Sequence, residues 1–460
     1  MIKKFANQYS FFLVFLSIYV VLLILRSPDL FVHGRLFAEG GSRFFNFSLI
    51  NNSFDSIFYL PGMQGYYLLN TNLVYTMSKF LPLRYVGLFI FYSSLVIMLL
   101  PSTLFYIKSK ILITNPTERA VISFILFLLP SQNFHETFAN SINAQIYLSL
   151  SLLILLIFDS DNFNSFTTAM FVGLCLLSGI YSLIYLPIIL FKIFTNNFTE
   201  QFRFKYKYFK SPTFIVSISS LSIQFAVIIY TKFNNYLWPN KLSEVPTQES
   251  ITSIIYASFY SNIPWFIEIL IKETVYLNTI IFLSIMFLIF NTKLSLKINL
   301  VFLFSYVLVL FLISFGKASS GLDQRYQVAI SFILFTCIIL NFQSLNKKIK
   351  LPIYFLVLST FLASFYFQII NKDNAYFLNV EDEKYLFKNQ VDNLNNENSI
   401  LYHYPIGQEG SVWLTNFKNI NTELADFQKV SNMKLDNDLL LYEIILNFLT
   451  PDSVLGKLLD

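Results

Sequence analysis

The chain has 460 residues, of which 55% are hydrophobic and only 13% are charged, and phenylalanine alone occupies 53 positions. Soluble domains carry about 25% charged residues, so this composition excludes a water-soluble protein, because too few polar groups remain to cover its surface. The charge is also uneven. Residues 371–460 hold 7 basic and 14 acidic residues, a net charge of −7, whereas residues 1–370 carry +12. The sequence therefore predicts a membrane domain over residues 1–370 and an acidic soluble tail over residues 371–460.

Apolar runs of about 20 residues, the length that crosses a hydrocarbon layer of about 30 Å, recur along the first 370 residues. We expect an all-α integral membrane bundle with about eleven transmembrane helices. The predicted spans are residues 8–25, 85–107, 119–130, 143–158, 164–178, 180–195, 213–231, 275–291, 298–315, 328–343 and 351–370.

Lysine and arginine in the short loops gather on one side of these spans, which the positive-inside rule assigns to the cytoplasm. Eleven crossings from a cytoplasmic N-terminus place the tail in the periplasm, as a small α or α/β domain. The outer loops are then residues 26–84, 131–142, 232–274 and 316–327. We expect a multi-pass protein of the bacterial inner membrane, in contact with membrane lipid, with its functional residues on the periplasmic face. Nucleic acid is not an expected partner, because basic and aromatic residues do not alternate.

The first polar cluster lies in the first outer loop. Glu39 stands between Arg35 and Arg43 and is followed by Gly40 and Gly41, which permit a tight backbone. A carboxylate between two guanidinium groups suits a general acid or base in an anion-binding pocket. The alternative is a solvated loop whose charges neutralise one another.

The second polar cluster leads into the span predicted at residues 143–158. His135 and Glu136 are followed by Asn140, Asn143 and Gln145, which we expect at membrane depth. Polar backbone at that depth is tolerated where it lines a cavity or is buried in protein. The spacing of Glu136, Asn140 and Asn143 places them on one helix face. The alternative is hydrogen bonding between helices that only stabilises the bundle.

The third cluster is Arg325 and Tyr326, in the short turn before the span predicted at residues 328–343. A guanidinium on the outer side suits a phosphate or pyrophosphate, and the alternative is an interfacial anchor. These patterns require no particular cofactor. A divalent metal stays open, because the three histidines, His33, His135 and His403, all lie in outer segments, as do Glu39 and Glu136, although without a fixed ligand spacing.

Several short elements resemble, in shared order, a large group of bacterial polytopic membrane proteins of the glycosyltransferase C type. Residues 38–45 read Ala-Glu-Gly-Gly-Ser-Arg-Phe-Phe, where that group has Ala-Glu-Asp-Gly followed by a Phe pair. Further matching elements are Gly65-Tyr66, Leu81-Pro82, Asn143-Ala144-Gln145, Leu177-Ser178-Gly179, Leu186-Pro187 and Arg325-Tyr326. The resemblance implies a fold like that of the glycosyltransferase C type.

The resemblance also implies an enzyme, a glycosyltransferase that moves a sugar from a polyprenyl-phosphate donor to a cell-surface glycan or lipid acceptor. Glu39 is the implied catalytic base, with Glu136 as its substitute, because Gly40 stands where the group has an Asp. The implied substrate-binding residues are Arg35, Arg43, His135, Asn140, Asn143, Gln145, Arg325 and Tyr326. Two other functions stay open: a polymerase or ligase of lipid-linked oligosaccharides, and a polysaccharide flippase or transporter.

Overall fold

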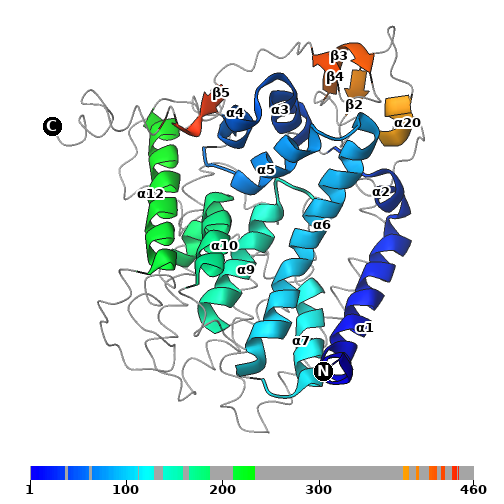
Figure 1. The fold of residues 1–460 in the computed structure, drawn as a ribbon, viewed down its shortest axis with the longest axis vertical. Coiled ribbons are helices and arrows are strands. Elements are labelled where there is room, and N and C mark those ends of the chain that lie inside the picture. Colours follow the sequence, from blue (N-terminus) through cyan, green and yellow to red (C-terminus); the bar gives the residue numbers. More distant parts are fainter. Residues whose placement is uncertain are drawn as a thin grey trace, which may run out of the picture.

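The computed structural model describes residues 2–36, 40–61, 65–111, 113–128, 138–158, 165–186, 211–233, 387–392, 400–402, 414–421, 426–429, 438–442 and 444. These residues form a row of long helices with short helices and strands across one end (Figure 1). The N-terminus lies at the opposite end of the row.

Three helices of the described chain are long and apolar enough to cross a membrane. They are α1 (Ile2–Arg26), α6 (Leu83–Lys108) and α12 (Pro212–Phe233). Each coincides with a span predicted from the sequence, because a run of about 20 apolar residues satisfies its backbone in lipid only as a helix. The structure thus confirms a mostly helical membrane protein.

Shorter helices occupy three more of the predicted spans. They are α7 (Pro116–Leu128), α9 (Ala144–Phe158) and α10 (Phe166–Leu177). The span predicted at residues 180–195 begins instead with a 3-10 turn, η3 (Ile180–Tyr185), and its part beyond residue 186 lies outside the described residues. The four predicted spans between residues 275 and 370 also lie outside them, so the number eleven stays a prediction.

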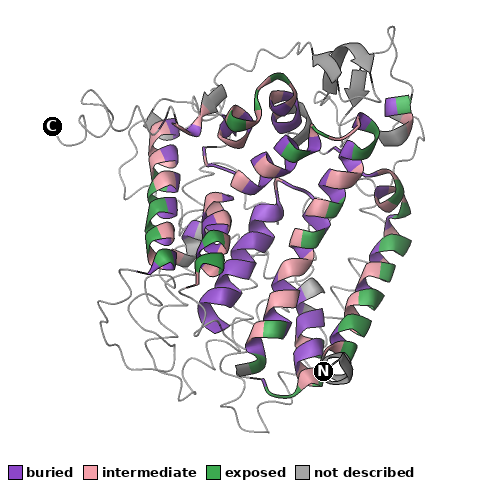
Figure 2. Ribbon diagram, in the orientation of Figure 1, coloured by how far each residue is buried: buried purple, intermediate pink, exposed green. Residues whose placement is uncertain are grey.

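Helix α9 forms the centre of this row. All of its residues are buried (Figure 2), and it packs against α6 on one side and α10 on the other, which in turn packs against α12. Its two serines are satisfied within the helix: Ser149 Oγ donates to Ile146 O at 2.7 Å and Ser151 Oγ to Tyr147 O at 2.8 Å. These hydrogen bonds remove the cost of burying the two hydroxyl groups.

Helix α1 lies at one edge of the row and packs against α7. Its inner face contributes aromatic contacts, such as Phe15 with Phe124 at 5.2 Å between ring centroids. Its other face leaves Phe11, Leu13 and Val14 about half exposed (Figure 2). Large apolar side chains on the outside of a helical bundle fit contact with lipid.

Residues 27–82, here called the cap, lie across the end of the helices where α1 finishes and α6 begins (Figure 1). The sequence predicted these residues as an outer loop, and their described parts are mostly folded. The cap contains α2 (Pro28–His33), the π-helical turn η1 (Gly40–Phe45), α3 (Asn46–Ile50), α4 (Ser53–Ile57), β1 (Tyr59–Pro61) and α5 (Leu69–Ser78).

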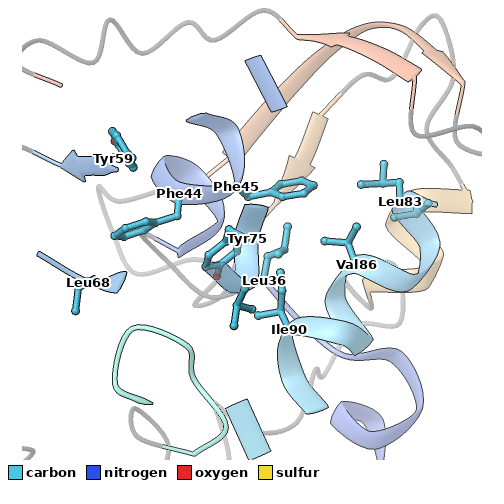
Figure 3. Close-up of a cluster of buried hydrophobic side chains, with 11 residues drawn as sticks. Leu36, Phe44, Phe45, Tyr59, Leu68, Tyr75, Leu83, Val86 and Ile90 are labelled. Atoms are coloured by element: carbon cyan, nitrogen blue, oxygen red, sulfur yellow. The ribbon is translucent and has the colours of Figure 1, made fainter. Parts of the chain in front are cut away.

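An aromatic core holds the cap onto α6 (Figure 3). The ring of Phe44 meets Tyr59 edge-on at 5.5 Å and stacks with Tyr75 at 6.0 Å. Leu83 and Val86 of α6, both fully buried, close the cluster from the helix side. Burying such large rings supplies much of the free energy that fixes the cap.

Parts of the acidic tail pack onto the same end of the bundle as the cap. Strand β5 (Asp438–Leu440) pairs antiparallel with β1, with Leu60 opposite Leu439. Behind this pair, Leu441 and Ile444 are buried against the cap and α12. The other described pieces of the tail are α20 (Phe387–Asp392), β2 (Ile400–Tyr402), β3 (Leu414–Asn421) and β4 (Asp426–Lys429), and the last three form an antiparallel sheet in the order β2-β3-β4.

Gly34, between α2 and Arg35, marks the closest approach of the cap to α6. It has φ +66°, and a Cβ built on it would lie 2.2 Å from the carbonyl carbon of Gly87.

We expect Gly34→Ala to destabilise the protein, because backbone strain alone costs about 1–3 kcal/mol and α2 must also move away from α6. The measurement is the thermal midpoint of the detergent-purified protein. Val32→Ala, a truncation at an exposed position two residues earlier, should leave the midpoint near that of the wild type. Equal midpoints for Gly34→Ala and Val32→Ala would contradict this close contact.

Candidate functional site: a buried polar layer under the cap

A layer of polar side chains separates the cap from the apolar helices. Each member is no more than 6% exposed. We call this set the polar layer; its members are Arg35, Asn70, Thr71, Asn140, Ser141, Asn143, Gln145, Ser178 and Gln224. Because buried polar groups are costly without partners, the hydrogen bonds of this layer determine how the cap sits on the bundle.

Arg35, in the connection that follows α2, joins the cap to the turn before α9. Its Nη2 donates to the carbonyl oxygen of Phe138 at 2.7 Å. Its charge also acts on Tyr75: burial raises the pKa of this phenol well above its usual value, and the hydrogen bond with Ser141 and the charge of Arg35 offset this only in part. Tyr75 is therefore neutral, and its oxygen accepts from Ser141 Oγ at 3.2 Å.

Residues 138–143 form a turn that leads into α9. Asn140 Oδ1 accepts from Ile142 N at 3.1 Å, and Asn140 O accepts from Ala144 N at 2.9 Å. Thr71 Oγ1 of the cap donates to Ser141 O at 3.0 Å. The helix begins only at Ala144. The expectation that Asn140 and Asn143 lie on one helix face is therefore wrong, because Asn140 caps a turn through its own side chain.

The end of α10 docks against the cap and against Gln145. Ser178 Oγ accepts from Asn70 N at 3.0 Å, and Leu68 and Ser178 form an antiparallel bridge. Gly179 has φ +133°, and a Cβ built on it would lie 2.0 Å from Gln145 Oε1. Gln145 Nε2 reaches the hydroxyl of Tyr66 at 3.4 Å. Only glycine therefore fits between Ser178 and Gln145.

Two buried polar atoms of this corner have no hydrogen-bond partner in the described part of the chain. They are Gln145 Oε1, an acceptor, and Asn70 Nδ2, a donor. Gln145 Oε1 faces Gly179, and the backbone of Asn70 is bonded to the neighbouring Ser178. An unsatisfied donor together with an unsatisfied acceptor complements a group that carries both, such as an amide or a peptide unit.

Gln224 connects α12 to the cap and to the end of α10. It was not among the residues predicted from the sequence. Its Oε1 accepts from Tyr67 N at 3.1 Å, and its Nε2 donates to Tyr67 O at 2.9 Å and to Leu176 O at 3.2 Å. A lone glutamine inside an apolar span was the available signal, because amides in such helices bond across helices.

The structure brings four of the predicted residues into this layer: Arg35, Asn140, Asn143 and Gln145. Arg43 lies in η1 and is half-buried. The other predicted residues, Glu39, Glu136, His135, Arg325 and Tyr326, lie outside the described residues. Within the described ranges no group of three or more His, Cys, Asp or Glu side chains could hold a metal ion, so a divalent metal stays an expectation for the remainder.

Comparison with known proteins connects part of this layer to a family. Residues 129–197 match the family described as "Protein export membrane protein SecD/SecF, C-terminal". The matched segment contains α9, α10 and the Ser178-Gly179 step. No curated protein and no solved structure matches the chain.

This match corrects the resemblance to the glycosyltransferase C type, because it points to a different family of membrane proteins. The expected glycosyltransferase activity, the polyprenyl-phosphate sugar donor and the glycan or lipid acceptor are wrong on this finding, as are the polymerase or ligase and the polysaccharide flippase. The elements behind the resemblance were two or three residues long. In the structure, several of them act in packing: Leu177-Ser178-Gly179 docks α10, and Gln145 fits against Gly179.

Gln224→Leu should lower the stability of the protein. The substitution leaves the buried amide and carbonyl of Tyr67 and the carbonyl of Leu176 without this partner, at about 1–3 kcal/mol for each unsatisfied group. Ser222→Leu, on the exposed face of the same helix, is the matched control and should be close to neutral. Thermal midpoints in detergent compare the two. A Gln224→Leu midpoint equal to that of Ser222→Leu would show that these hydrogen bonds do not fix the cap.

Proposed function

We propose that this protein is a multi-pass inner-membrane protein that assists the export of polypeptides across the bacterial cytoplasmic membrane. The observation that carries the proposal is the match of residues 129–197 to a family of protein export membrane proteins. The matched residues include the fully buried central helix α9 and the inner half of the polar layer. The match thus falls on the central helix of the bundle and on polar groups that join this helix and α10 to the cap.

The architecture proposed with this function keeps eleven spans, a membrane domain over residues 1–370 and a soluble tail over residues 371–460. The N-terminus is cytoplasmic, and the cap and the tail are periplasmic. Two observations support this orientation. The cap and the described tail pieces occupy one end of the bundle (Figure 1), and Lys108, Lys110 and Arg119 occupy the other, as the positive-inside rule expects of a cytoplasmic side.

The polar layer is the proposed contact for the exported chain. An extended polypeptide presents one N–H and one C=O at each residue. The unsatisfied Gln145 Oε1 and Asn70 Nδ2 complement that pair. Arg35 and Asn140 hold the neighbouring turn in place, Asn143 is buried in that turn, and Arg43 belongs to the adjoining part of the cap.

This arrangement also gives a route for movement. Gln224, Ser178 and Arg35 tie the cap to three different parts of the bundle: α12, α10 and the turn before α9. A shift among these parts would therefore move the cap relative to the membrane. Coupling of this kind needs packed elements that move as rigid bodies, which the aromatic core of the cap provides.

Depletion of this protein should slow the export of signal-peptide-bearing precursors. Pulse-chase labelling of an exported reporter measures the rate at which precursor becomes mature protein. Complementation with the wild type should restore that rate, and complementation with Gln145→Leu should restore it only partly, because the free acceptor is lost. Ser222→Leu, on the exposed face of α12, is the control and should complement fully.

The two parts of this proposal fail separately. Unchanged precursor processing in depleted cells would overturn the export function itself. Slow processing in depleted cells, together with full complementation by Gln145→Leu, would keep the export function and remove the polar layer as the contact for the exported chain.

A further inference from the structure

The connection between α6 and α7, at the end of the bundle opposite the cap, contains a buried cation. Arg119 in the first turn of α7 is 2% exposed. Among the described residues, its Nε and Nη1 have no hydrogen-bond partner. Ser109, in the short 3-10 turn η2 (Ser109–Ile111) that precedes α7, is fully buried, and its Oγ is unsatisfied in the same way. These groups are donors that lack an acceptor.

The contacts of Arg119 do not neutralise its charge. Its guanidinium lies over the ring of Tyr106, 5.0 Å from the centroid. Tyr106 in turn stacks on Phe12 of α1 at 4.5 Å. An aromatic face attracts a cation, but it offers no acceptor for the N–H groups. A buried charge without a paired anion is strongly unfavourable, which points to an anion that completes this site.

The titratable groups of the described residues near Arg119 do not supply this anion. Lys108 and Lys110 are the basic groups of the same connection, and Lys110 is exposed. Glu118, the acidic neighbour in the first turn of α7, makes no ion pair with Arg119 in the described part of the chain. Among the described residues the local charge is therefore positive, and it lies at the N-terminal end of α7, where the helix dipole also favours an anion.

We infer that Arg119, with Ser109 and Lys110, binds the phosphate of an anionic phospholipid headgroup. A lipid phosphate is favoured over free phosphate because the outer face of α1 carries apolar side chains at the level of this site, where Phe12 stacks on Tyr106. Phe11, Leu13 and Val14 of α1, which packs on α7, are each at least 50% exposed. Acyl chains would cover this face, while the phosphate lies at the end of the helices. Basic pockets between membrane helices recognise anionic headgroups in this way.

The test uses the full chain, purified in detergent and examined by native mass spectrometry. Phosphatidylglycerol, phosphatidylcholine and inorganic phosphate are titrated separately. The wild type should retain phosphatidylglycerol at least about fivefold better than phosphatidylcholine, the preference that one additional cation near a headgroup provides. Arg119→Gln should lose that preference. Arg84→Gln, which removes an exposed arginine at the cap end, should keep it.

Three results would overturn the inference: an unchanged lipid preference in Arg119→Gln, an equal loss in Arg84→Gln, or saturable binding of inorganic phosphate without any lipid preference. If Arg119→Gln does not fold, the thermal midpoint of the wild type decides the question. A rise with phosphatidylglycerol that phosphatidylcholine does not produce, and that Lys110→Gln reduces, supports the site. The absence of a selective rise overturns it.

Discussion

Polar groups at the junction of the cap and the bundle are removed from water, and this constraint shapes the described structure. Each such group must find a hydrogen-bond partner inside the protein. Gln224 meets the requirement for the backbone of Tyr67, Ser178 for the amide of Asn70, and Arg35 for the carbonyl of Phe138. The position of the cap therefore follows from a few side chains, and the aromatic core then adds apolar burial to an arrangement that these bonds specify.

The same constraint distinguishes polar groups that only stabilise the fold from polar groups that are available for a ligand. Several polar groups of the layer have a structural role: Asn140 caps its turn, Thr71 donates to the carbonyl oxygen of Ser141, and Ser178 bonds α10 to the cap. Polar residues gathered on one side of a membrane protein are thus weak evidence for catalysis. The groups left over are more informative, because a native fold leaves few buried polar atoms unsatisfied. Two of them, an acceptor on Gln145 and a donor on Asn70, lie within or beside the segment that matches the export family.

The two ends of the helical row differ in whether their buried polar groups find partners within the described chain. At the cap end, strand β5 of the tail adds to β1, and Tyr442 donates to Asp55 at 3.2 Å, so a segment nearly 400 positions away completes the cap. At the other end, the buried guanidinium of Arg119 lies over the ring of Tyr106, and its Nε and Nη1 have no acceptor among the described residues. The first end is completed by the chain itself, whereas the second has a charge that the described chain does not balance.

The sequence by itself determined the membrane class and the approximate positions of the apolar helices α1, α6, α7, α9, α10 and α12, because hydropathy is a local property that each span carries within its own 20 or so residues. It also indicated that Arg35, Asn140, Asn143 and Gln145 belong to a polar region. Only the tertiary structure decided their partners, the start of α9 at Ala144, the role of Gln224 and the pairing of β1 with β5. The reason is distance along the chain: these contacts join residues 103, 108 and 157 positions apart, or more, and no local pattern specifies which partner a buried donor will find.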